Sequence, residues 1–212
     1  MKPTLFFDLD GTLIDSEIGI TRCVAHALEA LGEPVPDAAA LRRWIGPPLR
    51  ASFMPLLRDA QRVEQAVAHY RERFEDIGWQ EHRVYDGIAE LIDQLAARGH
   101  RLAVVTAKNE PHAERIVSHL PFGHHFESIV GASLDASRGE KTELIAEAMR
   151  RLSLGPGDCV MIGDRHMDID GARAHGMRGL GVLWGFGGEA ELRDAGAHAL
   201  LRHPQELESV LA

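Results

Sequence analysis

Short apolar runs and helical apolar stripes alternate along much of this chain. The runs end at polar or glycine-containing turns and lie at residues 5–7, 102–105, 128–130, 159–162 and 181–184. Helical patterns fill most of the intervals between them, such as the apolar residues of 88–95, which are followed by a stop at Gly99. Buried strands separated by helices are typical of parallel strands with crossover connections. The pattern therefore predicts an α/β protein built on a parallel, Rossmann-like sheet.

The segment between the first two predicted strands is unusually long. Residues 16–84 show helical patterning and no clear strand, which is far beyond a usual connection. One face of a long helix is marked by apolar residues at steps of four and three: Val63, Val67, Tyr70, Phe74 and Ile77. Glycine and proline at 46–48 predict a break between two helices. We expect a core domain at 1–15 and 85–212 and an inserted helical cap domain at 16–84.

Composition narrows the class of protein. The chain has 212 residues, 45% of them hydrophobic, and a net charge of -9, so its surface as a whole repels nucleic acid polymers and anionic lipid. The apolar run near the N-terminus is too short for a signal peptide or a membrane span, and we expect a cytoplasmic location. Cys23 and Cys159 lie far apart, and neither His166 nor the pair His124 and His125 has the spaced partners of a transition-metal site.

The first segment with candidate chemistry is the stretch from Phe7 to Thr12. It places Asp8 and Asp10 at the carboxyl end of a predicted buried strand, the edge at which open parallel sheets bind ligands. Gly11 lets the chain turn there, so that both carboxylates can reach one small volume. Two crowded acids need a cation, and Mg2+ prefers such hard oxygen ligands. An ordinary Asp-Gly turn after a strand is the structural alternative.

Three further segments follow the same arrangement of a strand, a polar turn and a helix. Thr106 follows the second strand, where a hydroxyl and free backbone N–H groups would suit phosphate oxygens, although a cap or turn role is also common. Lys141 lies at a predicted helix start, where a lysine is usually solvated. Asp164, Asp168 and Asp170 follow another buried strand; we take Asp164 as the metal ligand and Asp170 as a helix-start acid. The combination of four such junctions carries more weight than any one of them.

This set of residues resembles the four motifs of the haloacid dehalogenase superfamily. The matches are the stretch 8–12, Thr106, Lys141, and Gly163-Asp164 with Asp168. The helical insert is similar to the cap of the phosphoglycolate phosphatase-like branch, and segments such as 44–49 and 181–187 are similar to bacterial 5′-nucleotidase-like members. Two departures are Thr142, where many phosphoglycolate phosphatases have proline, and Ala107, where relatives often have Asn or Ser.

The resemblance implies a Mg2+-dependent phosphatase. Asp8 would be the nucleophile that forms an aspartyl-phosphate, and Asp10 the general acid and base. The metal site would draw on Asp8, Asp10 through its carbonyl oxygen, Asp164 and Asp168, although Asp168 could instead orient Lys141. Thr106 and Lys141 would hold the phosphate. Further substrate contacts would come from the following residues: Gly11, Thr12, Ala107, Lys108 and Arg43. Arg43 and Lys108 are expected at the substrate rim.

Other readings of the same residues remain open. A haloacid dehalogenase attacks carbon and has no need of Asp10, whereas a sugar phosphomutase shares the scaffold and the aspartyl-phosphate. A phosphate-binding regulatory module without turnover is a third alternative, although it has no evident need of all the acids. The expected partner is a small phosphate ester such as a nucleoside 5′-monophosphate or phosphoglycolate, with no nucleic acid polymer and no membrane. The oligomeric state stays open.

Overall fold

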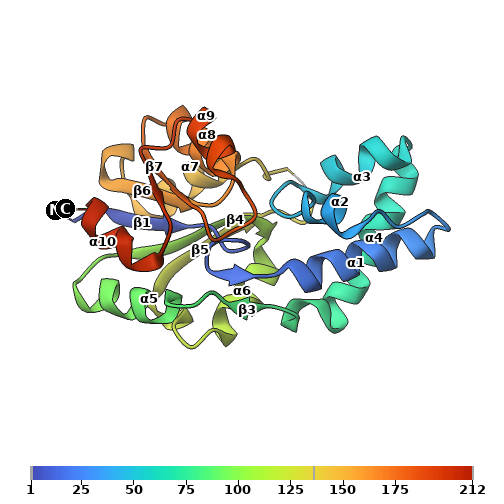
Figure 1. The fold of residues 1–212 in the computed structure, drawn as a ribbon, viewed down its shortest axis with the longest axis horizontal. Coiled ribbons are helices and arrows are strands. Elements are labelled where there is room, and N and C mark those ends of the chain that lie inside the picture. Colours follow the sequence, from blue (N-terminus) through green and yellow to red (C-terminus); the bar gives the residue numbers. More distant parts are fainter. Residues whose placement is uncertain (1, 136, 212) are drawn as a thin grey trace. The chain divides into compact units, whose positions relative to one another are not determined.

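The structure is a computed structural model that describes residues 2–135 and 137–211 (Figure 1). The chain folds into two compact units. One consists of residues 1–14 and 84–212 and is called the core unit here; the other consists of residues 15–83 and is called the helical unit. The core unit contains every residue of the four motifs.

The core unit is built on a six-stranded sheet in the order β5-β4-β1-β6-β7-β8. All of its pairings between described residues are parallel, for example Leu5 of β1 with Leu102 of β4 and with Val160 of β6. The strands are β1 Thr4–Phe7, β4 Leu102–Asn109, β5 Phe126–Ala132, β6 Cys159–Gly163, β7 Arg178–Val182 and β8 Ala199–Leu201. The predicted α/β class with a parallel sheet is therefore confirmed. β1 lies inside the sheet, between β4 and β6.

Helices cover both faces of this sheet. Figure 1 shows α7, α8 and α9 on one side of the strands and α5 and α6 on the other. The helices of the core unit are α5 Ile88–Ala97, α6 Glu110–His119, α7 Lys141–Leu152, α8 His166–Ala174, α9 Glu189–Asp194 and α10 Leu207–Leu211. On one face, Phe6, Val105 and Met161 of the strands pack against Leu144 of α7 and Ala172 of α8, all fully buried. Because the strands bury side chains on both faces of the sheet, they appear in the sequence as continuous apolar runs.

The helical unit contains four α-helices among its residues, all of which the structure describes. They are α1 Glu17–Ala30, α2 Ala38–Arg42, α3 Leu49–Leu57 and α4 Ala60–Asp76, followed by the short 3-10 helix η1 Gly78–Gln80. The break expected at 46–48 lies between α2 and α3. α4 begins at Asp59, whose carboxylate accepts a hydrogen bond of 2.8 Å from the Arg62 N–H, an N-cap. The strands β2 Ile14–Asp15 and β3 Arg83–Val84 pair with each other.

Several details differ from the sequence-based expectation. Ile77 was expected on the buried face of the long helix, but α4 ends at Asp76 and the Ile77 side chain is exposed. The strand expected at 181–184 is shifted toward the N-terminus, and β8 was not predicted because three residues are too few for a clear pattern. Among the described residues, no helix is both long enough and apolar enough to cross a membrane.

Candidate active site

Three neighbouring strands deliver the candidate residues to one edge of the sheet. Asp8 follows β1, Asp164 follows β6, and Thr106 lies within β4. Because β1 lies between β4 and β6 and all three are parallel, their carboxyl ends meet at this edge. Lys141 starts α7 and Asp168 lies in the first turn of α8. Residues that are far apart in the sequence therefore come together at this edge.

Three aspartates form a buried cluster at the centre of the site. Asp8, Asp164 and Asp168 each place a carboxylate oxygen within 4.8 Å of the others. Burial, together with the nearby charges of Asp168 and Asp10, raises the pKa of Asp8 to about 6, against the opposing effect of Lys141. Burial and the charges of Asp168 and Asp8 also raise the pKa of Asp164 well above its ordinary value. The negative charge of the three carboxylates is thus not fully neutralised by nearby cations.

Lys141 is the cation inside this cluster. Its Nζ lies 2.7 Å from Asp168 Oδ1 and 3.0 Å from Asp8 Oδ1, and it donates a hydrogen bond of 2.9 Å to the Val105 carbonyl oxygen. Burial alone would lower the pKa of Lys141, but the carboxylates of Asp168 and Asp8 raise it above the usual range. The lysine is therefore a buried, charged partner of the acids and not a solvated surface charge.

Asp168 and Asp170 have different positions despite their proximity in sequence. Asp168 is fully buried; besides the contact with Lys141, its Oδ2 accepts a hydrogen bond of 3.0 Å from the Arg165 N–H. Asp168 is thus positioned both to orient Lys141 and to accept the backbone N–H at the start of α8. Asp170 instead forms surface ion pairs with His166 at 3.0 Å and Arg173 at 3.2 Å. It lies apart from the cluster, as a helix-start acid would.

Asp10 pairs with Lys108. The Lys108 Nζ lies 3.0 Å from Asp10 Oδ2, and only 7% of the lysine side chain and 9% of the aspartate side chain are exposed. The other carboxylate oxygen of Asp10 is buried and accepts no hydrogen bond from the described part of the chain. Lys108 was expected at the substrate rim; its ammonium group lies on the candidate acid and base, and a contact with substrate stays a prediction. The ammonium group reaches Asp10 because β4 extends to Asn109 and carries Lys108 inward.

The turn after β1 is shaped by Gly11. Its φ is +86°, and a Cβ atom at this position would overlap the Asp164 carboxylate. The Gly11 N–H donates to the Ile14 carbonyl oxygen at 2.8 Å, and the Thr12 hydroxyl donates to Asp164 Oδ1 at 3.4 Å. Gly11 and Thr12 thus lie against the acid Asp164, and their expected contact with substrate stays a prediction. Only glycine allows the carboxylate to approach the backbone this closely.

A loop that the sequence did not mark as functional also holds Asp164. The Phe186 N–H donates to Asp164 Oδ2 at 2.8 Å, and Trp184 Nε1 donates to the Thr12 carbonyl oxygen at 3.0 Å. A Cβ atom at Gly185 would overlap both the Gly11 carbonyl oxygen and the Asp164 side chain. This loop contains Gly185, Gly187 and Gly188. Its run of glycines directly after a strand is the signal that points to close backbone approach.

The remaining candidates lie as follows. Thr106 is buried, and its hydroxyl accepts a weak hydrogen bond of 3.3 Å from the Lys108 N–H. Ala107 lies beside it in β4, partly exposed. Arg43 belongs to the helical unit, where it is exposed at the end of α2. A substrate contact by Arg43 stays a prediction.

The carboxylate oxygens of this site suit a hard divalent cation, one that prefers oxygen ligands. Four buried acids, Asp8, Asp10, Asp164 and Asp168, face two buried ammonium groups, those of Lys108 and Lys141. The surplus of negative charge is costly in a buried site unless a cation neutralises it. All the offered ligand atoms of the cluster are carboxylate oxygens, which suit magnesium, calcium and manganese ions.

Comparison with known proteins agrees with this geometry. The family model described as haloacid dehalogenase-like hydrolase matches residues 5–182. The chain is 47% identical to a 5′-nucleotidase of Pseudomonas aeruginosa over 192 residues, 90% of this chain and 87% of that protein. It is 39% identical to the tyrosine-protein kinase PtkA of Mycobacterium tuberculosis over 206 residues, 97% of this chain and 70% of that protein.

A solved structure shows the same fold. It is that of a predicted phosphatase from Clostridium acetobutylicum, with a TM-score of 0.95 and 37% identity over 100% of this chain and 98% of that one. Members of this family generally use a divalent metal, for which the acidic cluster provides ligands. The family model, the relatives and the site geometry lead to one conclusion: the chain belongs to the haloacid dehalogenase-like hydrolases and is a phosphatase of that family.

Proposed function

We propose that the chain is a Mg2+-dependent phosphatase that hydrolyses small phosphate monoesters through an aspartyl-phosphate on Asp8. The observation that carries this proposal is the convergence of Asp8, Asp164 and Asp168 on one buried volume with Lys141 among them. A protein that only bound phosphate would gain nothing from surrounding an anion with so many buried acids.

Magnesium would be held by Asp8, Asp164 and the carbonyl oxygen of Asp10, and when bound it would neutralise charge on the phosphoryl oxygens. Asp164 is prepared for this task, because the Phe186 N–H and the Thr12 hydroxyl fix its two oxygens. Asp168 is engaged by Lys141 and by the Arg165 N–H, so we assign it to orienting the lysine.

The chain's own residues supply the nucleophile and the proton transfers. Asp8 attacks phosphorus, and Asp10 protonates the departing alcohol and later takes a proton from the water that hydrolyses the aspartyl-phosphate. Lys108 orients the Asp10 carboxylate through the contact of 3.0 Å. Lys141, the Thr106 hydroxyl and the Ala107 N–H hold the phosphate and balance the charge that develops during transfer.

Nucleoside 5′-monophosphates are the substrate class that we favour. The relative that is 47% identical is named a 5′-nucleotidase, and Thr142 replaces the proline of many phosphoglycolate phosphatases. Phosphoglycolate is the alternative phosphatase substrate. A phosphomutase activity would require a bisphosphate intermediate to be retained, and no contact between described residues favours it.

The proposal is tested by phosphate release from p-nitrophenyl phosphate with magnesium and with EDTA. We expect turnover with magnesium and none in EDTA. Asp8→Asn removes the nucleophile and should lower kcat by at least about a thousandfold. Asp170→Asn is the matched control, because Asp170 is a nearby aspartate outside the cluster, and it should retain activity. Full activity in EDTA, or in Asp8→Asn, would refute the mechanism.

The substrate class is tested separately by a panel of nucleoside monophosphates, phosphoglycolate and sugar phosphates. We expect the highest kcat/KM for a nucleoside monophosphate. A higher value for phosphoglycolate would overturn the substrate assignment and leave the aspartyl-phosphate mechanism intact. Conversion of a sugar phosphate to its isomer without release of inorganic phosphate would identify a mutase.

A further inference from the structure

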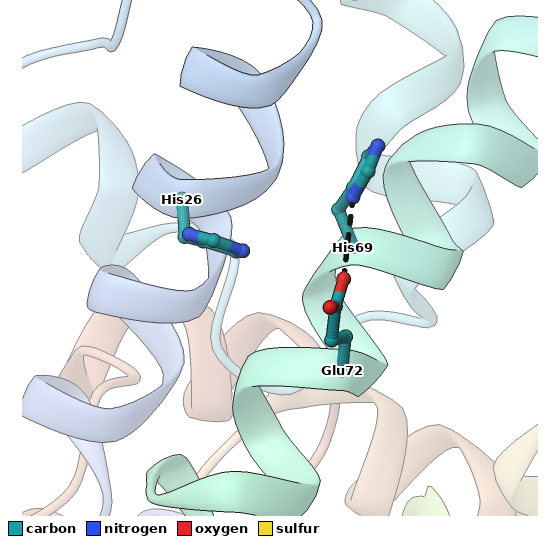
Figure 2. Close-up of side chains that lie close together, drawn as sticks. All are labelled: His26, His69 and Glu72. Carbon is teal, nitrogen blue, oxygen red and sulfur yellow. Dashed lines mark ion pairs between the residues drawn. The ribbon is translucent and has the colours of Figure 1, made fainter.

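A second cluster of metal-ligating side chains lies on the helical unit. His26 of α1 and His69 and Glu72 of α4 each offer one ligand atom, and these atoms lie within 4.8 Å of one another. Figure 2 shows the His26 ring extending from α1 toward α4, where His69 and Glu72 lie one turn apart. None of the three residues belongs to the four motifs, and the phosphatase mechanism does not use them.

One distance between ligand atoms in this cluster already matches the distance expected around a bound zinc ion. His69 Nδ1 lies 3.5 Å from Glu72 Oε2, and the rings of His26 and His69 are edge to face with centroids 6.4 Å apart. A zinc ion with ligands at about 2.0–2.1 Å holds its ligand atoms roughly 3.4 Å apart. The histidine-carboxylate distance meets this value as it stands. Rotation of the side chains would shorten the remaining distances between ligand atoms. Such rotation has room, because 39% of the His69 side chain and 75% of the Glu72 side chain are exposed.

The two helices that carry the ligands are held together independently of any ion. Arg73 of α4 donates to the buried Cys23 Sγ of α1 at 3.2 Å, and Val24 of α1 and Val67 of α4 are both buried. The ligand-bearing backbone is therefore fixed in advance, as a metal site requires.

Three arginines of these two helices have acidic partners. Arg22 and Arg73 both pair with Glu81, at 2.6 Å and 2.8 Å, and Arg62 pairs with Glu33 at 2.7 Å. Their positive charge is thus balanced by acids other than Glu72. Glu72 pairs with His69 of the same cluster, so its carboxylate and the two imidazoles can act as a set.

We propose that His26, His69 and Glu72 bind a divalent transition-metal ion of the zinc class. Two imidazole nitrogens and one carboxylate oxygen suit zinc, nickel, cobalt or copper ions, whereas magnesium prefers oxygen ligands alone. The site differs in kind from the all-carboxylate cluster of the core unit. A bound ion would join α1 to α4 and stabilise the helical unit by mass action.

The test uses the full chain, Zn2+ as the probe and a constant millimolar concentration of magnesium to occupy the all-oxygen cluster. Binding is followed by calorimetry and by NMR of the histidine ring nitrogens. We expect zinc to shift the ring signals of His26 and His69 at about one equivalent. His69→Gln and His26→Gln should each weaken this binding by at least about tenfold. Glu72→Gln should weaken it less, because both imidazoles remain.

Two matched controls separate this site from zinc binding elsewhere. His124→Gln removes an exposed histidine of the core unit and should leave the affinity unchanged, and so should Asp164→Asn, which disrupts the carboxylate cluster. Equal affinity in wild type and His69→Gln would overturn the proposal, as would histidine shifts confined to the core unit. Circular dichroism of each variant checks that the helices remain folded, so a loss of binding can be assigned to the ligand.

Discussion

Lys108 Nζ lies 3.0 Å from Asp10 Oδ2, while Lys141 Nζ lies 3.0 Å from Asp8 Oδ1. Each of the two acids assigned to the chemistry therefore has its own buried ammonium partner. Because the two lysines contact different acids, the loss of either one should give a different kinetic result.

The Lys108→Met variant tests the role of the first pair. Without its ammonium partner the Asp10 carboxylate loses its fixed orientation, and we expect kcat to fall by about tenfold or more while KM changes less. Lys108→Arg keeps a cation within reach and should recover part of kcat. Steady-state kinetics on p-nitrophenyl phosphate measures both variants. A rise in KM with unchanged kcat would instead show that Lys108 only binds substrate, as expected from the sequence.

Loss of Lys141 should affect stability as well as turnover. Lys141→Met leaves Asp8 and Asp168 buried without their cation, and breaking a buried pair from one side costs about 3–5 kcal/mol. The pKa of Asp8 is raised to about 6 with Lys141 present and should rise further without it. The loss should therefore shrink as the pH falls through this range, because a protonated Asp8 no longer needs a partner. Urea unfolding of the metal-free variant at pH 7.5 and at pH 5 measures this.

A double variant provides the control for Lys141. Lys141→Met with Asp168→Asn removes one of the two unpaired charges and should regain part of the stability without regaining activity. If the double variant were no more stable than Lys141→Met, the cost would come from lost packing around the lysine stem and not from unpaired charge.

Metal-free stability should depend on pH through Asp8. The pKa of Asp8 is raised in the folded state from 3.8 to about 6, so the folded protein holds this proton more tightly than the unfolded chain. By linkage, this group makes stability fall as the pH rises from about 4 to 6. Asp8→Asn removes the charge and should stabilise the metal-free protein at pH 7.5 by on the order of 1 kcal/mol, but little at pH 4.

Thermal unfolding in EDTA at the two pH values measures this effect. Asp76→Asn is the matched control, since Asp76 is an exposed acid of α4 and its change should stay within about 0.5 kcal/mol at both pH values. Equal effects of Asp8→Asn at both pH values would contradict the assignment of the burial cost to this carboxylate.

Gly11→Ala tests the close approach of the first turn to Asp164. Gly11 and Gly99 both have positive φ, +86° and +78°, but a Cβ atom would overlap Asp164 only at Gly11, while at Gly99 no heavy atom lies within 4 Å. Gly99→Ala should therefore cost about 1–2 kcal/mol from backbone strain alone. Gly11→Ala should cost more and should also weaken magnesium binding, because it displaces the carboxylate. Comparable losses in both variants, with magnesium binding intact, would show that the backbone strain alone matters.

Much of the fold and of the site was predictable from residue patterns. The strands that carry Asp8 and Asp164 are uninterrupted apolar runs, so their ends could be located within one or two residues. β8 was missed because it has three residues, of which only Leu201 is buried. β7 is shifted because Gly179 and Gly181 interrupt its apolar pattern, while Leu183 and Trp184 extend that pattern past the end of the strand.

The contacts between distant segments could not be predicted from the sequence. Nothing in the spacing of Lys108 indicates that β4 continues past Thr106 and turns this side chain toward Asp10. The contact between Phe186 and Asp164 joins two separate loops, and the cluster of His26, His69 and Glu72 depends on how two helices pack. Such relationships are set by tertiary packing and leave no periodic signal in the chain.

The position of β1 at the interior of the sheet has a consequence for the order of assembly. Asp8 is synthesised before the strands on both sides of β1, which are β4 and β6, and before the helix that bears Asp168. β1 cannot pair until these distant strands have been made, and sheets formed by such long-range pairing form slowly. On the proposed mechanism, a nascent chain that ended before α8 would therefore carry the candidate nucleophile Asp8 without a complete acidic cluster around it.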